Sequence, residues 1–402
     1  MEINKFLTYA LLALITLMPW NATAINTYGF GHLLPKPKFA HLSNLSNTLA
    51  ESLLIKGLLE ITQGKNQQAL DTIDKLLVST PNFKLANLVR GDLLMAQGRS
   101  LQGFGSAETN QTEAVKDLQD EARVRIERYL SNKDTEKLPS LLIAPNDKQS
   151  HVMVVDTDKS RLYLYKNDQD KLTYVADYYI TVGKNGLGKQ AQGDKRTPIG
   201  VYFLGKKLTQ PLADIYGEAA YPLNYPNEWD SQHNKNGSGI WLHGTPSNTY
   251  SRPPRASDGC VVLTNQDLKT LEPILQAGNI PLIIASNLKW LNTENSAERQ
   301  SLQTALDQWL NDWRSQNTSQ YLSHYSRDFF SSDMSYPKWA EHKTKVQSSK
   351  PKVEIDISEV SMFAYPDSAS KMVVVDFLQN FSSPALSNKM LKRQYWIFEN
   401  DG

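Results

Sequence analysis

The chain contains one cysteine, Cys260, and a histidine, His243, lies seventeen residues before it. A thiol is a usable nucleophile only where its pKa is lowered or a base takes its proton, and a neighbouring imidazole can do both. Apolar residues precede His243 and follow Cys260, which predicts two strand segments joined by the Pro-, Ser- and Arg-containing loop 246–256. A lone cysteine is more often a small buried hydrophobic residue. The glycines beside both residues favour a nucleophile–base pair at one edge of a sheet.

These segments resemble the L,D-transpeptidase catalytic domain of the YkuD-like family. That family carries His-Gly, a variable loop, and then Ser/Thr-x-Gly-Cys followed by an aliphatic residue. The matching residues of this chain are His243-Gly244 and Ser257-Asp258-Gly259-Cys260-Val261. At two positions the chain departs from the common pattern, because Asp258 stands where many members have histidine, and Val262 where many have arginine or asparagine.

The resemblance implies that Cys260 is the nucleophile and His243 the general base. It also implies that the backbone carbonyl of Gly244 orients the imidazole. A tetrahedral oxyanion needs backbone N–H donors. The N–H groups of Gly259 and Cys260 are the candidates, since a glycine before the nucleophile allows a sharp turn.

Four further residues are candidates for substrate binding. Ser257 and Asp258 are expected to contact either His243 or the substrate, with a cap of the loop as the alternative for Asp258. Arg252 and Arg255 lie on the loop between the catalytic pair and could hold a substrate carboxylate. Their alternative is a solvated loop without a binding role.

The substrate that the resemblance implies is the stem tetrapeptide of peptidoglycan, processed through a thioacyl-enzyme. Transfer of the acyl group to an amine is L,D-transpeptidation, which is the leading interpretation. Transfer to water is L,D-carboxypeptidase trimming of tetrapeptide to tripeptide, which would act on cell shape. A non-catalytic wall-binding module is the third interpretation. The sequence leaves the choice of acceptor open.

The N-terminus predicts export. Lys5 precedes the apolar stretch 6–18, and Ala22-Thr23-Ala24 provides an A-x-A cleavage site. Residues 1–24 therefore read as a secretory signal peptide, with a retained membrane anchor as the alternative. We expect a protein of the periplasm or cell envelope that has no membrane span after cleavage. Its lone cysteine excludes an internal disulfide.

Charge and motifs exclude several classes of partner. The 43 basic and 42 acidic residues leave a net charge of +1, which argues against nucleic acid as a main partner. The seven histidines show no metal-ligand spacing, and there is no phosphate-binding Gly-x-x-x-x-Gly-Lys-Ser/Thr motif. We therefore expect no metal and no cofactor.

The remaining pattern predicts a multidomain α+β protein. Residues 40–135 have helical periodicity and a faint 34-residue repeat, typical of a tetratricopeptide-like region that serves packing, dimerisation or binding of a protein partner. Residues 150–286 have the period of two expected of a mainly-β L,D-transpeptidase catalytic domain. Residues 295–402 read as helices followed by three strands. This order resembles an NTF2-like α+β domain, for which we expect substrate positioning or dimerisation.

Two segments connect or interrupt these domains. Residues 133–148 are polar and contain proline, and are expected to be the boundary before the catalytic domain. Residues 206–235 form an insertion with Tyr221, Tyr225 and Trp229. Exposed aromatic residues would suit recognition of a glycan or peptide at the cleft, and local packing is the alternative.

Overall fold

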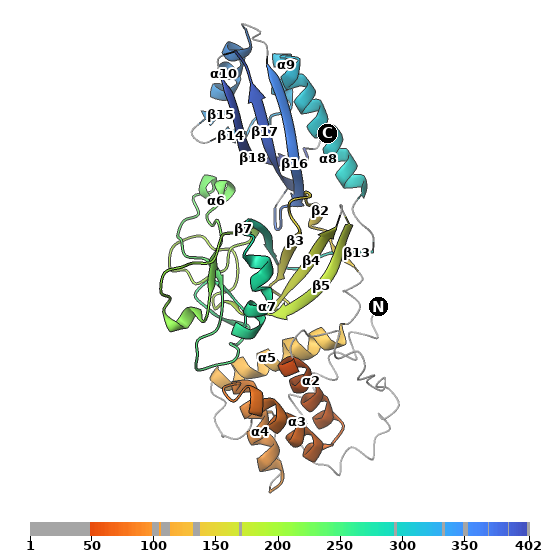
Figure 1. The fold of residues 1–402 in the computed structure, drawn as a ribbon, viewed down its shortest axis with the longest axis vertical. Coiled ribbons are helices and arrows are strands. Elements are labelled where there is room, and N and C mark those ends of the chain that lie inside the picture. The colour runs from red at the N-terminus through yellow and green to blue at the C-terminus, as the bar shows by residue number, and fades with distance from the viewer. Residues whose placement is uncertain are drawn as a thin grey trace. The chain divides into compact units, whose positions relative to one another are not determined.

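The computed structural model describes residues 49–98, 104–105, 113–131, 137–168, 171–292, 296–331, 334–348, 353–368, 370–384 and 386–399 (Figure 1). The predicted signal peptide lies outside these residues. The described chain has a helical N-terminal region, a sheet-rich central domain and a C-terminal α+β domain, as the sequence predicted. It divides into two compact units, the first of which joins the helical region to the central domain. Within the described ranges, no helix combines the length and apolar character needed to cross a membrane.

Four helices form the N-terminal region: α2 (Leu49–Thr62), α3 (Asn66–Ser79), α4 (Lys84–Ala96) and α5 (Glu113–Leu130). Leucine, isoleucine and alanine side chains at helical spacing bury one shared core. Gly57 lets α2 approach α3, because a Cβ there would lie 2.8 Å from Ile73 Cδ1. Its counterpart in the predicted repeat, Gly91, has nothing within 4 Å of that position. The repeat is therefore not reproduced in the packing.

Two sheets build the central domain. The larger has the order β5-β4-β3-β12-β7, with parallel pairing only where β12 meets β3 among the pairings described. The smaller has the order β11-β9-β8. The strands of the larger sheet are β3 (His151–Asp156), β4 (Arg161–Asp168), β5 (Lys171–Tyr179), β7 (Gly200–Leu204) and β12 (Ile280–Ala285). Those of the smaller sheet are β8 (Ala220–Pro222), β9 (Trp241–His243) and β11 (Val261–Val262), and a separate parallel pair joins β6 (Val182–Gly183) to β10 (Arg255–Ser257).

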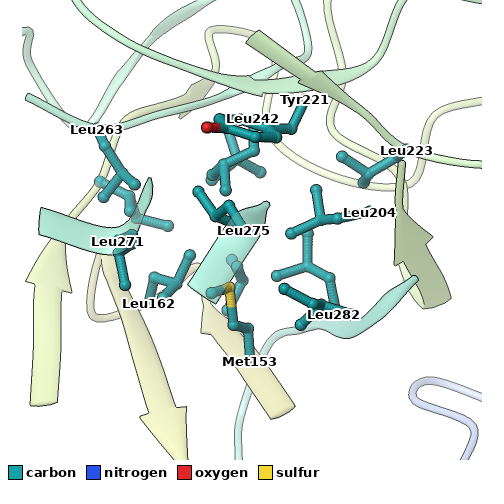
Figure 2. Packing of buried hydrophobic residues seen from close by; sticks show 14 of the residues in the cluster. Met153, Leu162, Leu204, Tyr221, Leu223, Leu242, Leu263, Leu271, Leu275 and Leu282 are labelled. Atoms are coloured by element: carbon teal, nitrogen blue, oxygen red, sulfur yellow. The ribbon is translucent and has the colours of Figure 1, made fainter. Parts of the chain in front are cut away.

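A single hydrophobic core lies between these sheets and helix α7 (Asn265–Leu275) (Figure 2). Met153 of the larger sheet, Leu242 of the smaller sheet and Leu275 of α7 all contribute to it. Thr264 is the N-cap of α7, and its side chain accepts a hydrogen bond from the backbone N–H of Asp267. The core thus supports β9, which carries His243, and β11, which directly follows Cys260.

The second unit has a sheet of order β18-β17-β16-β2 with three helices. Its elements are β2 (Leu142–Ala144), α8 (Ser296–Arg314), α9 (Thr318–Ser323), α10 (Tyr336–Ser348), β16 (Glu354–Ala364), β17 (Met372–Ser382) and β18 (Ser387–Ile397). The helices followed by three long antiparallel strands agree with the predicted order. The fourth strand, β2, comes from the segment expected to be a linker, and it pairs with β16.

Buried ion pairs join the helical region to the larger sheet. Glu51 of α2 accepts hydrogen bonds from Arg161 of β4, at 2.5 Å, and pairs with Arg125 of α5 at 3.1 Å. Arg128 of α5 reaches Asp177 of β5 at 2.5 Å. Burial alone would raise the pKa of Glu51, but Arg161 and Arg125 outweigh it and lower that pKa to about 2.

We expect Glu51→Gln to destabilise the first unit by about 3–5 kcal/mol, because it leaves three buried arginines facing only two carboxylates. The control is Asp74→Asn, which breaks a half-exposed pair with Arg90 and should cost less than about 1 kcal/mol. Urea denaturation at pH 7 measures both. Because the pKa of Glu51 is depressed, its contribution is complete above its unfolded pKa and is lost as pH falls toward 2. A Glu51→Gln deficit that persists unchanged at pH 2 would contradict this account.

Candidate active site

The register of two short strands sets the relation between Cys260 and His243. Strands β9 and β11 are parallel, with Leu242 opposite Val261 and His243 opposite Val262. Side chains alternate along a strand, and directly paired residues face the same side of the sheet. Leu242 and Val261 point into the core. His243 and Cys260 therefore lie on the other face, on neighbouring strands, and the loop 246–256 connects them.

The His243 imidazole is held as a neutral base. Its Nδ1 lies 2.7 Å from the carbonyl oxygen of Gly244, which assigns the donated proton to Nδ1 and makes Nε2 the acceptor nitrogen. The ring of Tyr216 meets the imidazole edge-on, with centroids 5.2 Å apart. Burial lowers the pKa of His243 to about 4, and the charge of Arg252 acts in the same direction. Hydrogen bonds to the backbone of Gly244 and Tyr216 both act to raise the pKa of the ring. The ring can thus accept a proton at neutral pH.

The Cys260 thiol is 9% exposed, and its sulfur lies 3.4 Å from the carbonyl oxygen of Gly239. Burial raises the pKa of this thiol, while a backbone N–H of Trp241 and the charge of Arg252 oppose the rise. The thiol is therefore protonated at neutral pH, and the His243 imidazole on the neighbouring strand is neutral as well. Such a thiol needs a base to become a nucleophile.

Hydrogen bonds fix the turn that presents Cys260. Gly259 has φ +123°, which a side chain at this position would strain, and a Cβ there would lie 2.8 Å from the Arg196 carbonyl oxygen. Thr197 donates its hydroxyl to the Gly259 carbonyl at 2.9 Å. Ser257 donates to the Cys260 carbonyl at 2.6 Å and accepts from the Gly259 N–H at 3.1 Å. Both hydrogen bonds of the Ser257 hydroxyl thus stay inside the turn.

One of the two expected oxyanion donors is therefore engaged. The Gly259 N–H is directed at Ser257 and not at the catalytic face. Across the ranges that the structure describes, no acceptor is directed at the Cys260 N–H. The geometry favours the N–H of Cys260 over that of Gly259 as the oxyanion donor.

The structure separates the candidate substrate residues. Asp258 is exposed and forms an ion pair with Lys184 at 2.9 Å, a hydrogen bond that lowers its pKa. Arg255 is exposed on β10. Arg252 is half-buried, its guanidinium donates to the Ala256 carbonyl, and its charge acts on both His243 and Cys260. Arg252 is the residue of these three whose charge acts on both members of the candidate pair, while Asp258 acts on Cys260 in the opposite direction.

Residues 150–284 match the family model of the L,D-transpeptidase catalytic domain (YkuD). Residues 301–402 match that of the Cds6 C-terminal NTF2-like domain. The chain therefore carries an L,D-transpeptidase catalytic domain and an NTF2-like domain. Both are the domains that the sequence motifs indicated, and no curated protein matches the chain.

Three solved structures are similar in fold to this chain over about two thirds of its length. Two crystal structures of the helical cell shape determining protein Pgp2 from Campylobacter jejuni are 24% identical, with TM-scores of 0.59 and 0.58. They cover 69% and 66% of this chain, and 95% and 92% of their own. Bd1075 from Bdellovibrio bacteriovorus is 26% identical with a TM-score of 0.55, over 66% of this chain and 95% of its own. The similarity extends over nearly the whole length of these proteins.

The insertion in the L,D-transpeptidase domain does not place its predicted aromatic residues at the catalytic pair. Tyr221 and Tyr225 are buried in the core, so local packing accounts for them. Trp229 packs against His233, with ring centroids 4.2 Å apart. The insertion instead contributes Tyr216.

Three residues near the catalytic pair were missed from the sequence. Tyr216 packs on Trp241, with ring centroids 4.7 Å apart, as well as on His243. Trp241 stands two residues before His243 on the same strand, so strand alternation could have placed it on the catalytic face. Thr197 lies 62 residues before Gly259, and only the fold shows that its hydroxyl donates to the Gly259 carbonyl.

No group of three or more histidine, cysteine, aspartate or glutamate side chains in the described ranges has an arrangement that could hold a metal ion.

We expect Gly259→Ala to disturb the nucleophile turn more than Gly186→Ala. Both glycines have positive φ, +123° and +81°, so each alanine carries a conformational cost of about 1–2 kcal/mol. Only at Gly259 would the new Cβ also overlap a backbone oxygen, while Gly186 has nothing within 4 Å. Thermal unfolding and the alkylation rate of Cys260 measure the difference. Equal effects of the two substitutions would show that the turn is not sterically constrained.

Proposed function

We propose that Cys260 and His243 are the nucleophile and general base of an enzyme that acts on peptidoglycan stem tetrapeptides through a thioacyl-enzyme. The observation that carries this proposal is the register of β9 and β11, which puts a neutral imidazole and the sole thiol on one face of an L,D-transpeptidase domain. The protein would act in the cell envelope, where this substrate is found.

Acylation of the enzyme follows from the protonation states of the pair. The Cys260 proton moves to His243 Nε2 as the sulfur attacks the carbonyl carbon between the L-centre of the diamino acid and the terminal D-alanine. The Cys260 N–H donates to the oxyanion that forms. When the intermediate collapses, the C–N bond breaks and the imidazolium gives its proton to the departing amine. The product is a thioester on Cys260, with free D-alanine.

The second half of the reaction depends on the acceptor. His243 takes a proton from water or from an amine, the acceptor attacks the thioester carbonyl, and the thiol is restored. Two observations favour water. The position opposite His243 is Val262, whose apolar side chain offers no charge to hold an acceptor. A solved structure that is similar in fold over 66% of this chain is that of a protein described as determining helical cell shape, a role that trimming of stem peptides would serve.

We therefore propose L,D-carboxypeptidase trimming of tetrapeptide to tripeptide as the activity. L,D-transpeptidation is the second candidate, and the match to the L,D-transpeptidase catalytic domain favours it. A wall-binding module without turnover is the outcome if neither product forms.

We expect Cys260→Ala and Cys260→Ser to abolish turnover of purified disaccharide tetrapeptide while the protein stays folded. His243→Ala should reduce kcat by about 10²–10⁴-fold, which is typical for loss of a general base. The matched control is His233→Ala, an exposed histidine directly after α6 (Glu228–Gln232), and it should retain full activity. Because burial lowers the pKa of His243 to about 4, activity should persist below pH 6 and fall as pH drops through 4. Turnover by Cys260→Ala protein would refute the mechanism.

The acceptor is identified by mass spectrometry of the products formed with and without a D-amino acid in the reaction. We expect tripeptide and free D-alanine as the products, even at high acceptor concentration. Exchange of the terminal residue, or cross-linked dimers, would instead establish L,D-transpeptidase activity. Bound but unchanged tetrapeptide would leave only the wall-binding function.

A further inference from the structure

The loop that joins His243 to Cys260 is held by the helical region. Asn82, just before α4, donates its side-chain amide to the Ser247 carbonyl at 3.0 Å and accepts from the Tyr250 N–H at 3.3 Å. The Tyr250 ring is buried in the core of the helices and lies 4.7 Å from the ring of Phe83. A residue of the catalytic loop is thus part of the hydrophobic core of another region.

The next residue of the loop is tied to a buried carboxylate. Ser251 donates its hydroxyl to Glu121 Oε1 of α5 at 2.7 Å, and both residues are buried. Arg125, one turn further along α5, holds the same oxygen at 2.9 Å. A buried carboxylate held by Arg125 gives the Ser251 hydroxyl a fixed acceptor, so Glu121 helps to hold Ser251 in place.

The residue after Ser251 is held from the other side. Tyr179 donates its hydroxyl to the Arg252 carbonyl at 2.8 Å, and Thr181 does so at 2.9 Å. The guanidinium of Arg125 lies over the Tyr179 ring, 3.7 Å from its centroid. Arg125 therefore contacts a partner of Ser251 and a partner of Arg252, and so links the two bonds that hold this part of the loop.

The position of this backbone matters for the chemistry because of Arg252. Its positive charge opposes the rise of the Cys260 pKa that burial causes, and it lowers the pKa of His243. Two other charges act on the thiol: Lys189 also lowers its pKa, and Asp258 raises it. Both effects of Arg252 fall off with distance, so a shift of the loop would weaken them. The proposed function provides no other role for Glu121, which touches neither member of the catalytic pair in the contacts described.

We propose that Glu121 is a positioning residue of the catalytic centre, and that it acts through Ser251 to fix the loop backbone that carries Arg252. This inference rests on the proposed function in one respect, namely that Cys260 is the reacting group. It gives the helical region a part in catalysis without any contact with the substrate.

The test is the pH profile of Cys260 alkylation by iodoacetamide in the full chain, where a single cysteine makes the signal specific. Ser251→Ala removes the hydroxyl but leaves Glu121 paired with Arg125. We expect the apparent pKa of Cys260 to rise by about one unit, which lowers the rate at pH 7 about tenfold. The matched control is Thr72→Val, which removes a buried hydroxyl–carboxylate bond of 2.7 Å between α3 and Glu60 of α2, in the same helical region. It should leave the profile unchanged.

A double-substitution cycle separates positioning from general loss of structure. Arg252→Gln should raise the apparent pKa at least as much as Ser251→Ala, and adding Ser251→Ala to it should have little further effect, because both act through the same charge. Identical profiles of the unsubstituted and Ser251→Ala proteins, or fully additive shifts, would overturn this inference. Muropeptide turnover by Cys260→Ser protein would overturn the proposed function and, with it, the catalytic role of the positioning. The alkylation profile would still show whether Ser251 acts on the thiol, so the two failures are distinguishable.

Discussion

Pairing of buried charged side chains between the helical region and the larger sheet is the constraint on which the first unit depends. Moving an ion out of water costs several kcal/mol, and the cost is offset only where each charge has a close partner. Three arginines of this cluster face three carboxylates, those of Glu51, Glu121 and Asp177. A fourth carboxyl nearby, Asp267, has its pKa raised to about 7 by burial. The positive and negative charges of the cluster are equal without Asp267. The helical region and the larger sheet cannot separate without leaving buried charges unpaired.

This constraint reaches the candidate catalytic pair through ordinary contacts. The same α5 that supplies Arg125 and Arg128 also supplies Glu121, the partner of Ser251. On the other side, the core beneath β9 and β11 fixes the register that pairs His243 with Val262. The site is therefore held between a polar network and an apolar core. Burial of the pair then favours neutral forms of both, so that charge develops only during the reaction.

Local patterns in the sequence were sufficient to predict the domains and the candidate pair. His243, Cys260 and their neighbouring glycines stand in short motifs next to apolar strands, and strand alternation places them on one face. The ion cluster could not be predicted, because Glu51 and Arg161 lie far apart in the chain and only the fold joins them. Tyr221 was ambiguous for a similar reason, since an aromatic residue in an insertion packs inward or outward according to its tertiary neighbours. The role of Ser257 depends on the turn geometry, which a motif does not specify.

Strand β2 gives the second unit an unusual dependence on chain order. It is made before the L,D-transpeptidase domain, yet its partner β16 begins after that domain and three further helices. During synthesis, the central domain can complete its own core before the partner of β2 has been made. The C-terminal sheet then adds β2, which was translated first, at its edge. A fragment that starts after the catalytic domain would therefore leave one edge of that sheet open, and an unpaired edge is a site where chains associate with one another.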